Sequence, residues 1–161
     1  MNAMLLLPIL LSLLQTAAPA SSGWLRSPQG TVVKLYRRSL SWSKADEFCK
    51  DVDGRLVVDR TADMHLFLIK NVLKEKKSRV WVGLRRTAPH SRTWIWSDGT
   101  RQNEDDLNTN LWLRDEPNDA AGEEECALFM YSPWEKAWGL NDYLCRGGCR
   151  NYQFICEKWI R

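Results

Sequence analysis

The chain has 161 residues, of which 44% are hydrophobic and 27% charged, a composition typical of a globular protein with one domain of ordinary size. Its formal net charge is only +3, and its lysines and arginines are dispersed in short groups, which predicts solvated faces and no nucleic-acid interface. After the first twenty residues, no stretch reaches the roughly 18 apolar residues that a membrane-spanning helix needs, so no transmembrane segment is predicted.

The first twenty residues have the pattern of a secretory signal peptide. LLLPILLSLL (5–14) is an apolar run too short to span a bilayer, and Ala18-Pro19-Ala20 places small residues where signal peptidase cleaves. No Lys or Arg precedes the apolar run, so an uncleaved anchor is the alternative. We therefore predict a secreted, extracellular protein with cleavage near Ser21. The predicted organisation is a signal peptide over residues 1–20, a short N-terminal segment over 21–29 and a domain over 30–161.

A strand and a helix are predicted at the start of this domain. TVVKLYR (31–37) is β-branched and aromatic, as strands are. In SWSKADEFCKDVDG (41–54), apolar residues recur every three or four positions and predict a helix, which Ser41 or Ser43 can cap and Gly54 can end. Its expected buried stripe contains Ala45, Phe48 and Cys49.

A second helix is predicted over residues 61–77, after a short extended link at 56–58. Thr61 can cap this helix, and its lysines lie at the C-terminal end, where the helix dipole favours cations. The expected buried stripe contains Met64, Phe67, Leu68 and Val72.

The remaining predicted elements are strands, separated by one long polar loop. The loop, residues 101–124, has little that could form a helix or strand, and loops of this length in compact domains are usually functional or disordered. Helices followed by strands predict an α+β fold. Most of the nine tryptophans occupy strand-like positions and are expected in the core. The predicted strands are 79–84, 93–100 with a turn at Asp98-Gly99, 126–131, 137–140 and 151–159.

The end of this loop is strongly acidic. DEPNDAAGEEEC (115–126) holds six carboxylates and no Lys or Arg. Like charges packed this closely destabilise a folded loop unless something offsets them. The segment is therefore either an open, solvated acidic loop or a site where oxygen ligands hold a hard cation.

The five cysteines favour disulfides over a metal site. No CxxC pair occurs, and His65 and His90 stand alone in the sequence, so a zinc site is not predicted. In an oxidising compartment four cysteines can form two bridges and leave one over, and the sequence leaves the pairing open. The cysteines are Cys49, Cys126, Cys145, Cys149 and Cys156.

Several short motifs occur in the order found in one known family. Together they resemble a C-type lectin-like domain, from about residue 30 to the C-terminus. The resemblance implies a double-loop α+β fold in which two helices flank small antiparallel sheets and a long loop binds calcium. The motifs are WVGL (81–84), WSDG (96–99), EPN (116–118), EEC (124–126), ND (141–142) followed by Cys145, and the final Cys156.

The resemblance also implies how the cysteines pair. Cys49 would bond to Cys156, and Cys126 to Cys145. Cys149 has no counterpart in the family. It could replace Cys145 as the partner of Cys126, remain a free thiol, or link two chains into a dimer.

The same resemblance implies a Ca²⁺ and carbohydrate site. Calcium prefers carboxylate and amide oxygens, which these side chains supply, and Pro117 would follow a cis peptide bond. The order Glu-Pro-Asn implies glycans with equatorial 3- and 4-hydroxyls (mannose, GlcNAc or fucose), including those of microbial surfaces. The ligands implied both for calcium and for sugar are Glu116, Asn118, Glu124, Asn141 and Asp142.

Three departures from the family pattern affect the predicted site. Some relatives have a further calcium site with acids just after WIGL, but Arg86 and His90 lie near those positions here. That site is expected to lack ligands despite Asp119 and Glu125. The residue before Asn141 is leucine, where the family often has tryptophan. The acids of the loop at 102–115 have no assigned role and are expected to be solvated.

The sequence thus carries three hypotheses on function. The first is a secreted calcium-dependent lectin that catalyses nothing. The second is a calcium-independent module on the same fold that binds protein, ice or lipid. The third is a glycoside hydrolase that uses Glu116 and Glu124 as its carboxylate pair. If both carboxylates bind calcium, neither is free for proton transfer, so no enzyme is predicted.

Overall fold

A computed structural model describes residues 23–73, 75–104, 111–145 and 151–160. The predicted signal peptide and Cys149 lie outside these ranges. Within the ranges, the chain has an α+β fold, as predicted. No helix in the described part of the chain is long and apolar enough to cross a membrane.

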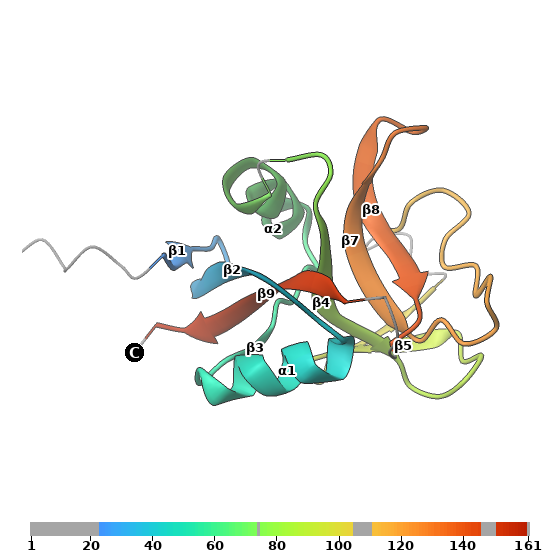
Figure 1. Ribbon diagram of the computed structural model, residues 1–161, viewed down its shortest axis with the longest axis horizontal. Helices are drawn as coiled ribbons and strands as arrows, with labels where there is room; N and C mark the ends of the chain where they lie inside the picture. Colours follow the sequence, from blue (N-terminus) through green and yellow to red (C-terminus); the bar gives the residue numbers. More distant parts are fainter. Residues whose placement is uncertain (1–22, 74, 105–110, 146–150, 161) are drawn as a thin grey trace, which may run out of the picture.

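The described strands form one mixed sheet whose main path runs β1-β2-β9-β4-β5-β6, with β3 paired to β9 and the β7–β8 hairpin attached to β4 (Figure 1). The β4–β9 pair is parallel and all other pairs are antiparallel. The strands predicted from the sequence are confirmed, but β1 lies before residue 30 and was not predicted. The prediction that the loop starts at residue 101 is wrong, because residues 101–103 pair with β5 as the strand β6. The strands are β1 (Leu25–Arg26), β2 (Thr31–Leu40), β3 (Arg55–Leu56), β4 (Arg79–Arg86), β5 (Thr93–Trp96), β6 (Arg101–Asn103), β7 (Cys126–Ser132), β8 (Ala137–Tyr143) and β9 (Tyr152–Trp159).

The first helix, α1 (Trp42–Asp51), forms where its apolar spacing predicts it. Ala45 and Cys49 are buried, and a disulfide joins Cys49 to Cys156 on β9. Trp42 is buried as well, and its indole Nε1 donates a hydrogen bond to the carbonyl oxygen of Val82, 2.8 Å away. Ser41 occupies the N-cap position, but its side chain makes no capping hydrogen bond.

The second helix is shorter than predicted. Thr61 caps α2 (Ala62–Phe67) by accepting a hydrogen bond from the Met64 amide, but the helix then widens into the π-helical turn η1 (Leu68–Val72) and ends. The prediction that it reaches residue 77 is wrong, and Lys70 is the basic residue in its last turn. Residues 75–78 are all polar, so a helical extension there would bury no apolar surface, and packing supplies most helix stability in proteins.

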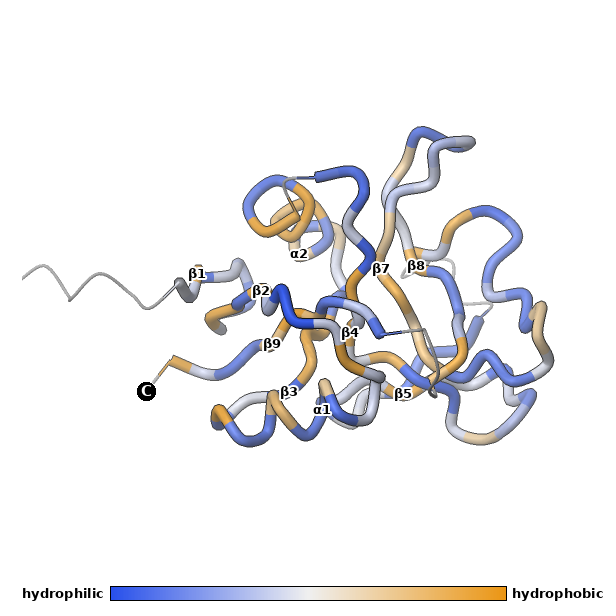
Figure 2. Tube along the Cα trace, in the orientation of Figure 1, coloured by the Kyte–Doolittle hydropathy of each residue, from blue (hydrophilic) through white to orange (hydrophobic). Residues whose placement is uncertain are grey.

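The two helices cover opposite faces of the sheet (Figure 1). Side chains alternate between faces along a strand. Val80 and Val82 on β4 therefore pack in the cluster that contains α2, whereas Trp81 between them packs in the cluster that contains α1. Figure 2 shows these central strands as the most hydrophobic part of the chain and the loops beyond them as hydrophilic.

The tryptophans divide into core and surface residues. Four of them are buried, three in predicted strands and one, Trp42, in the first helix. Trp134 and Trp159 are instead 95% and 63% exposed. The buried four are Trp42, Trp81, Trp94 and Trp96.

The WVGL motif has a glycine at position 83, where neighbouring atoms leave no room for a side chain. A Cβ atom at this position would lie 2.1 Å from Ser97 Oγ and 2.7 Å from the Leu56 carbonyl oxygen. The Ser97 hydroxyl donates a hydrogen bond to that same carbonyl, so it cannot move away without losing a buried contact.

We expect Gly83→Ala to lower the free energy of unfolding by about 1–3 kcal/mol, the usual cost of overpacking a close-packed interior. Urea unfolding followed by tryptophan fluorescence measures it. Ser39→Ala, at an exposed position of β2, is the matched control and should leave the midpoint unchanged. Equal midpoints for the two variants would contradict the close approach.

Candidate functional site

The long loop between β6 and β7 is held against one edge of the β7–β8 hairpin. The Leu113 amide donates to the Leu140 carbonyl at 2.9 Å, and the Leu140 amide donates to the Leu111 carbonyl at 2.8 Å. Gly139 permits this approach, since a Cβ there would lie 2.9 Å from Leu113 Cδ2. Leu140 is fully buried under the loop, and this pairing brings Glu116 beside Asn141.

The structure brings the predicted ligand residues together from two distant segments. Asn141 Nδ2 donates to Glu116 Oε1 at 2.6 Å, and the Asn118 amide donates to Asp142 Oδ1 at 3.0 Å. The Ala120 amide donates both to Asn118 Oδ1 and to Glu124 Oε2. The Glu116–Pro117 peptide bond is cis, as the family resemblance implies.

The carboxylates of this site oppose one another's ionisation. Burial and the neighbouring charges of Asp142 and Glu124 raise the pKa of Glu116 to about 8. Burial, followed by the charge of Asp142, also raises the pKa of Glu124. Glu116 Oε2 is buried, and no hydrogen-bond partner reaches it among the described residues. The site therefore has oxygen atoms that a cation would satisfy.

The donor set fits calcium in its chemistry. Carboxylate and amide oxygens are the ligands that calcium prefers, and the buried Oε2 of Glu116 has no hydrogen-bond partner among the described residues. Across the described ranges, no three His, Cys, Asp or Glu side chains are placed so as to hold a metal ion by themselves. The predicted ligand set would add the amide oxygens of Asn118 and Asn141 to the carboxylates.

Asp142 forms an ion pair with Arg86, a contact that the sequence did not predict. The Arg86 side chain is only 4% exposed, and its Nη2 donates to Asp142 Oδ2 at 3.0 Å. Its other nitrogens donate to Glu104 Oε1, to the Ser91 carbonyl and to the Glu124 carbonyl. The guanidinium also lies 4.6 Å from the ring centroid of Trp94. A fixed positive charge thus sits beneath the acidic site.

Glu104 corrects one prediction about the loop. Its carboxylate is not solvated but forms ion pairs with Arg86 at 2.8 Å and with Arg92 at 3.3 Å. The Trp94 indole also donates to Glu104 Oε1. The sequence offered no signal for this role, because the partners are up to 18 residues away along the chain.

His90 contacts a second acid of the loop. Its Nδ1 lies 2.8 Å from Asp119 Oδ2, and Asp119 Oδ1 accepts a hydrogen bond from the Glu124 amide. The hydrogen bond from Glu124, followed by the contact with His90, lowers the pKa of Asp119. Arg86 and His90 therefore both contact acids of the calcium-site region. That no second calcium binds there stays a prediction.

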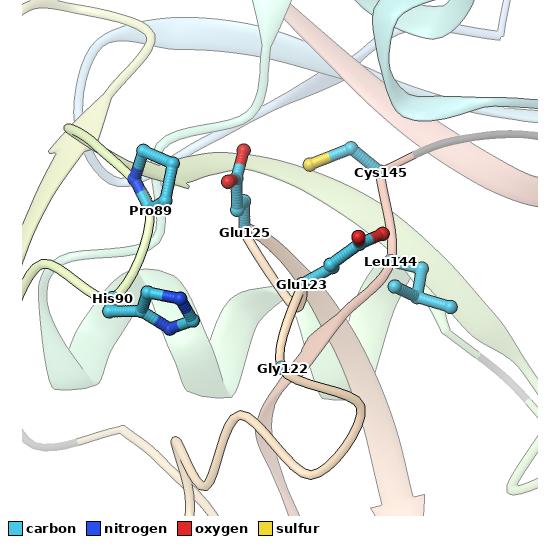
Figure 3. A pocket seen from close by; sticks show the side chains of 7 residues that line it. All are labelled: Pro89, His90, Gly122, Glu123, Glu125, Leu144 and Cys145. Atoms are coloured by element: carbon cyan, nitrogen blue, oxygen red, sulfur yellow. The ribbon is translucent and has the colours of Figure 1, made fainter.

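A separate pocket of about 400 Å³ is lined in part by residues of the same loop, among them Gly122, Glu123 and Glu125 (Figure 3). The carboxylate of Glu125 lies between Pro89 and Cys145, and the side chain of Glu123 extends toward Leu144. None of the five predicted ligand residues lines it. The pocket is therefore distinct from the predicted calcium and sugar site.

Two disulfides hold the ends of the site region. Cys126 at the start of β7 bonds to Cys145 just after β8, and Cys49 bonds to Cys156. This is the pairing that the resemblance implies, so Cys149 does not replace Cys145. Each bridge is expected to stabilise the domain by roughly 2–4 kcal/mol.

The comparisons with known proteins agree with the fold. The family model described as the lectin C-type domain matches residues 38–158. One snaclec anticoagulant protein chain of Deinagkistrodon acutus is 31% identical over 94% of this chain and 93% of its own length. Lactose-binding lectin l-2 of Anguilla japonica is 32% identical over 84% of this chain and 76% of its own. The C-type lectin domain of murine dendritic cell inhibitory receptor 2, solved in complex with an N-glycan, superposes with a TM-score of 0.72 at 22% identity, covering 88% of this chain and 99% of that one.

Proposed function

The chain belongs to the lectin C-type domain family, and from that premise we propose that it is a calcium-dependent carbohydrate-binding protein. Domains of this family typically serve as binding modules without enzymatic activity. The observation that carries the proposal is the convergence of the five predicted ligand residues around Glu116, whose buried Oε2 has no hydrogen-bond partner among the described residues.

The residues of the site offer a sugar both hydrogen-bond acceptors and hydrogen-bond donors. When bound, Ca²⁺ would accept lone pairs from two adjacent sugar hydroxyls. The carboxylates of Glu116 and Glu124 would accept hydrogen bonds from these hydroxyls, and the side-chain amides of Asn118 and Asn141 would donate hydrogen bonds to their oxygens. Asp142 Oδ1 keeps a lone pair beyond the one that the Asn118 amide uses, so it can still contribute.

We further propose mannose-type selectivity. The order Glu116-Pro117-Asn118 decides which side of the site presents an acceptor and which presents a donor, and the family uses this order for equatorial 3- and 4-hydroxyls. The relative named as a lactose-binding lectin shows that the family also includes proteins that bind a galactoside. An array that presents mannose, GlcNAc, fucose and galactose separates the two classes.

A calcium-independent binding module is the second candidate, and Asp142 is the observation that favours it. Its carboxylate already accepts hydrogen bonds from Arg86 Nη2 and from the amides of Asn118 and Asp119. The protein's own cation therefore neutralises one of the three carboxylates. One relative is named for an anticoagulant role and not for binding a sugar. Under this candidate the ligand would be a protein or lipid surface.

Titration with calcium distinguishes these candidates. We expect calorimetry of the purified protein to detect calcium binding, and retention on immobilised mannose to disappear when EDTA removes the metal. Magnesium in place of calcium is the control, since its smaller ion demands a tighter octahedral cage. Absence of calcium heat, together with glycan or protein binding that survives EDTA, would favour the second candidate.

We also propose that the protein is secreted, because both disulfides persist best in an oxidising compartment. Export from cultured cells tests this, with N-terminal sequencing expected to begin near Ser21. Retention inside the cell with the first twenty residues intact would contradict it.

A further inference from the structure

A groove of about 670 Å³ is lined in part by residues of the predicted sugar site. These are Glu116 and Asn141, which are hydrogen-bonded to each other. Pro133 and Trp134, from the turn of the β7–β8 hairpin, line another part. The groove is therefore continuous with the site rather than a separate cavity.

The two walls of the groove are joined by hydrogen bonds. The Arg114 amide on the loop side donates to Glu135 Oε2 on the hairpin side at 3.0 Å. Next to it, Leu113 is buried and hydrogen-bonded to β8. The turn that carries Trp134 is thus hydrogen-bonded to the loop that carries Glu116.

Trp134 is 95% exposed, in contrast to the four tryptophans buried in the core. Exposure of an indole ring on a turn leaves a large apolar surface in water, and such surfaces commonly mark ligand contacts. A hexose suits this surface as a partner, because one face of its ring carries apolar C–H groups while its edge carries hydroxyls. Aromatic rings with a polar edge suit partners that are apolar on one side and wet on the other.

The charges in the groove favour a neutral partner. Arg79 and Arg114 are countered by Asp115, Glu116 and Glu135, so no excess of positive charge is available for a phosphate or sulfate. The same groups are well suited to hydroxyls, which both donate and accept hydrogen bonds.

We propose that this groove is a second sugar subsite, which takes the next neutral hexose of an oligosaccharide whose terminal residue occupies the calcium site. The C–H face of this second hexose stacks on Trp134. The inference rests on the proposed function, since the first sugar must occupy the site at Glu116 and Asn141.

Trp134→Ala tests the subsite, with Trp159→Ala as the matched control at an exposed tryptophan that does not line the groove. In calcium, we expect Trp134→Ala to weaken mannobiose binding roughly 2- to 10-fold, the range for one aromatic contact, and to leave methyl mannoside binding unchanged. Trp159→Ala should change neither affinity. Titration calorimetry or competition on a mannose surface measures both sugars.

The indole N–H resonances give a second readout. The chain has nine tryptophans, and the nitrogen-15 peak missing in Trp134→Ala identifies that side chain. We expect mannobiose to shift this peak and methyl mannoside to leave it in place. Methyl mannoside binding with no effect of Trp134→Ala on mannobiose would overturn the subsite alone. Failure of both sugars to bind in calcium would overturn the proposed mannose-type binding at the calcium site and the subsite with it. A change in oligomeric state caused by Trp134→Ala, without a change in mannobiose affinity, would assign the ring to contact with a second copy and also overturn the subsite.

Discussion

Glu116→Gln is expected to remove calcium-dependent sugar retention while leaving the fold intact. The substitution keeps the size of the side chain but removes one of three carboxylates, and calcium affinity depends on the charge of its ligands. We expect calcium affinity to fall by more than about 10-fold, with mannose retention lost at calcium concentrations that saturate the unmodified protein.

The same substitution should not destabilise the free protein. Without metal, the Glu116 carboxyl group is buried close to those of Asp142 and Glu124, and burial together with these neighbouring charges raises its pKa. A neutral amide avoids both effects, so the urea midpoint in EDTA should be unchanged or higher. Glu123→Gln, at an exposed acid of the same loop, is the control and should bind calcium normally. Equal calcium affinity in the two variants would remove Glu116 from the ligand set.

Arg86→Met carries the largest expected effect on stability. Removing one partner of a buried ion pair costs about 3–5 kcal/mol, because the other charge stays buried without compensation. Here two acids lose the same partner, Asp142 completely buried and Glu104 largely so. The stability of Arg86→Lys should lie between those of the unmodified protein and Arg86→Met, since an ammonium keeps the charge but cannot reproduce the planar fork of donors.

Arg92 supplies a matched control for this measurement. It also pairs with Glu104, but its side chain is 68% exposed, and exposed pairs contribute below about 1 kcal/mol. Urea unfolding in EDTA should therefore separate Arg86→Met clearly from Arg92→Met. Similar midpoints for the two would mean that solvent already reaches the buried guanidinium and that the ion pair does not hold the loop.

The elements that could be predicted are those whose signals are local. Strand alternation, the spacing of Ala45 and Cys49 on α1 and the cap at Thr61 each depend on a few neighbouring residues, and each has its predicted place in the structure. The second helix was predicted too long because polar residues after Val72 are good helix formers, yet they have nothing to pack against.

The elements that could not be predicted depend on contacts between distant residues. Arg86 and Asp142 are 56 positions apart, and nothing in either local sequence indicates that they meet. For the same reason, Glu104 was expected in solvent, and Trp159, in the predicted strand 151–159, was expected in the core. The five ligand residues, by contrast, could be proposed because known motifs carry them, although their geometry could not.

The bridge between Cys49 and Cys156 closes most of the domain into a single covalent ring, because these cysteines are 107 positions apart. The whole acidic loop lies inside that ring. A protease that cut the loop once would therefore release no fragment, since both cleavage products would stay joined through the sulfur–sulfur bond. Such a nicked molecule would separate into two bands on a gel only after reduction.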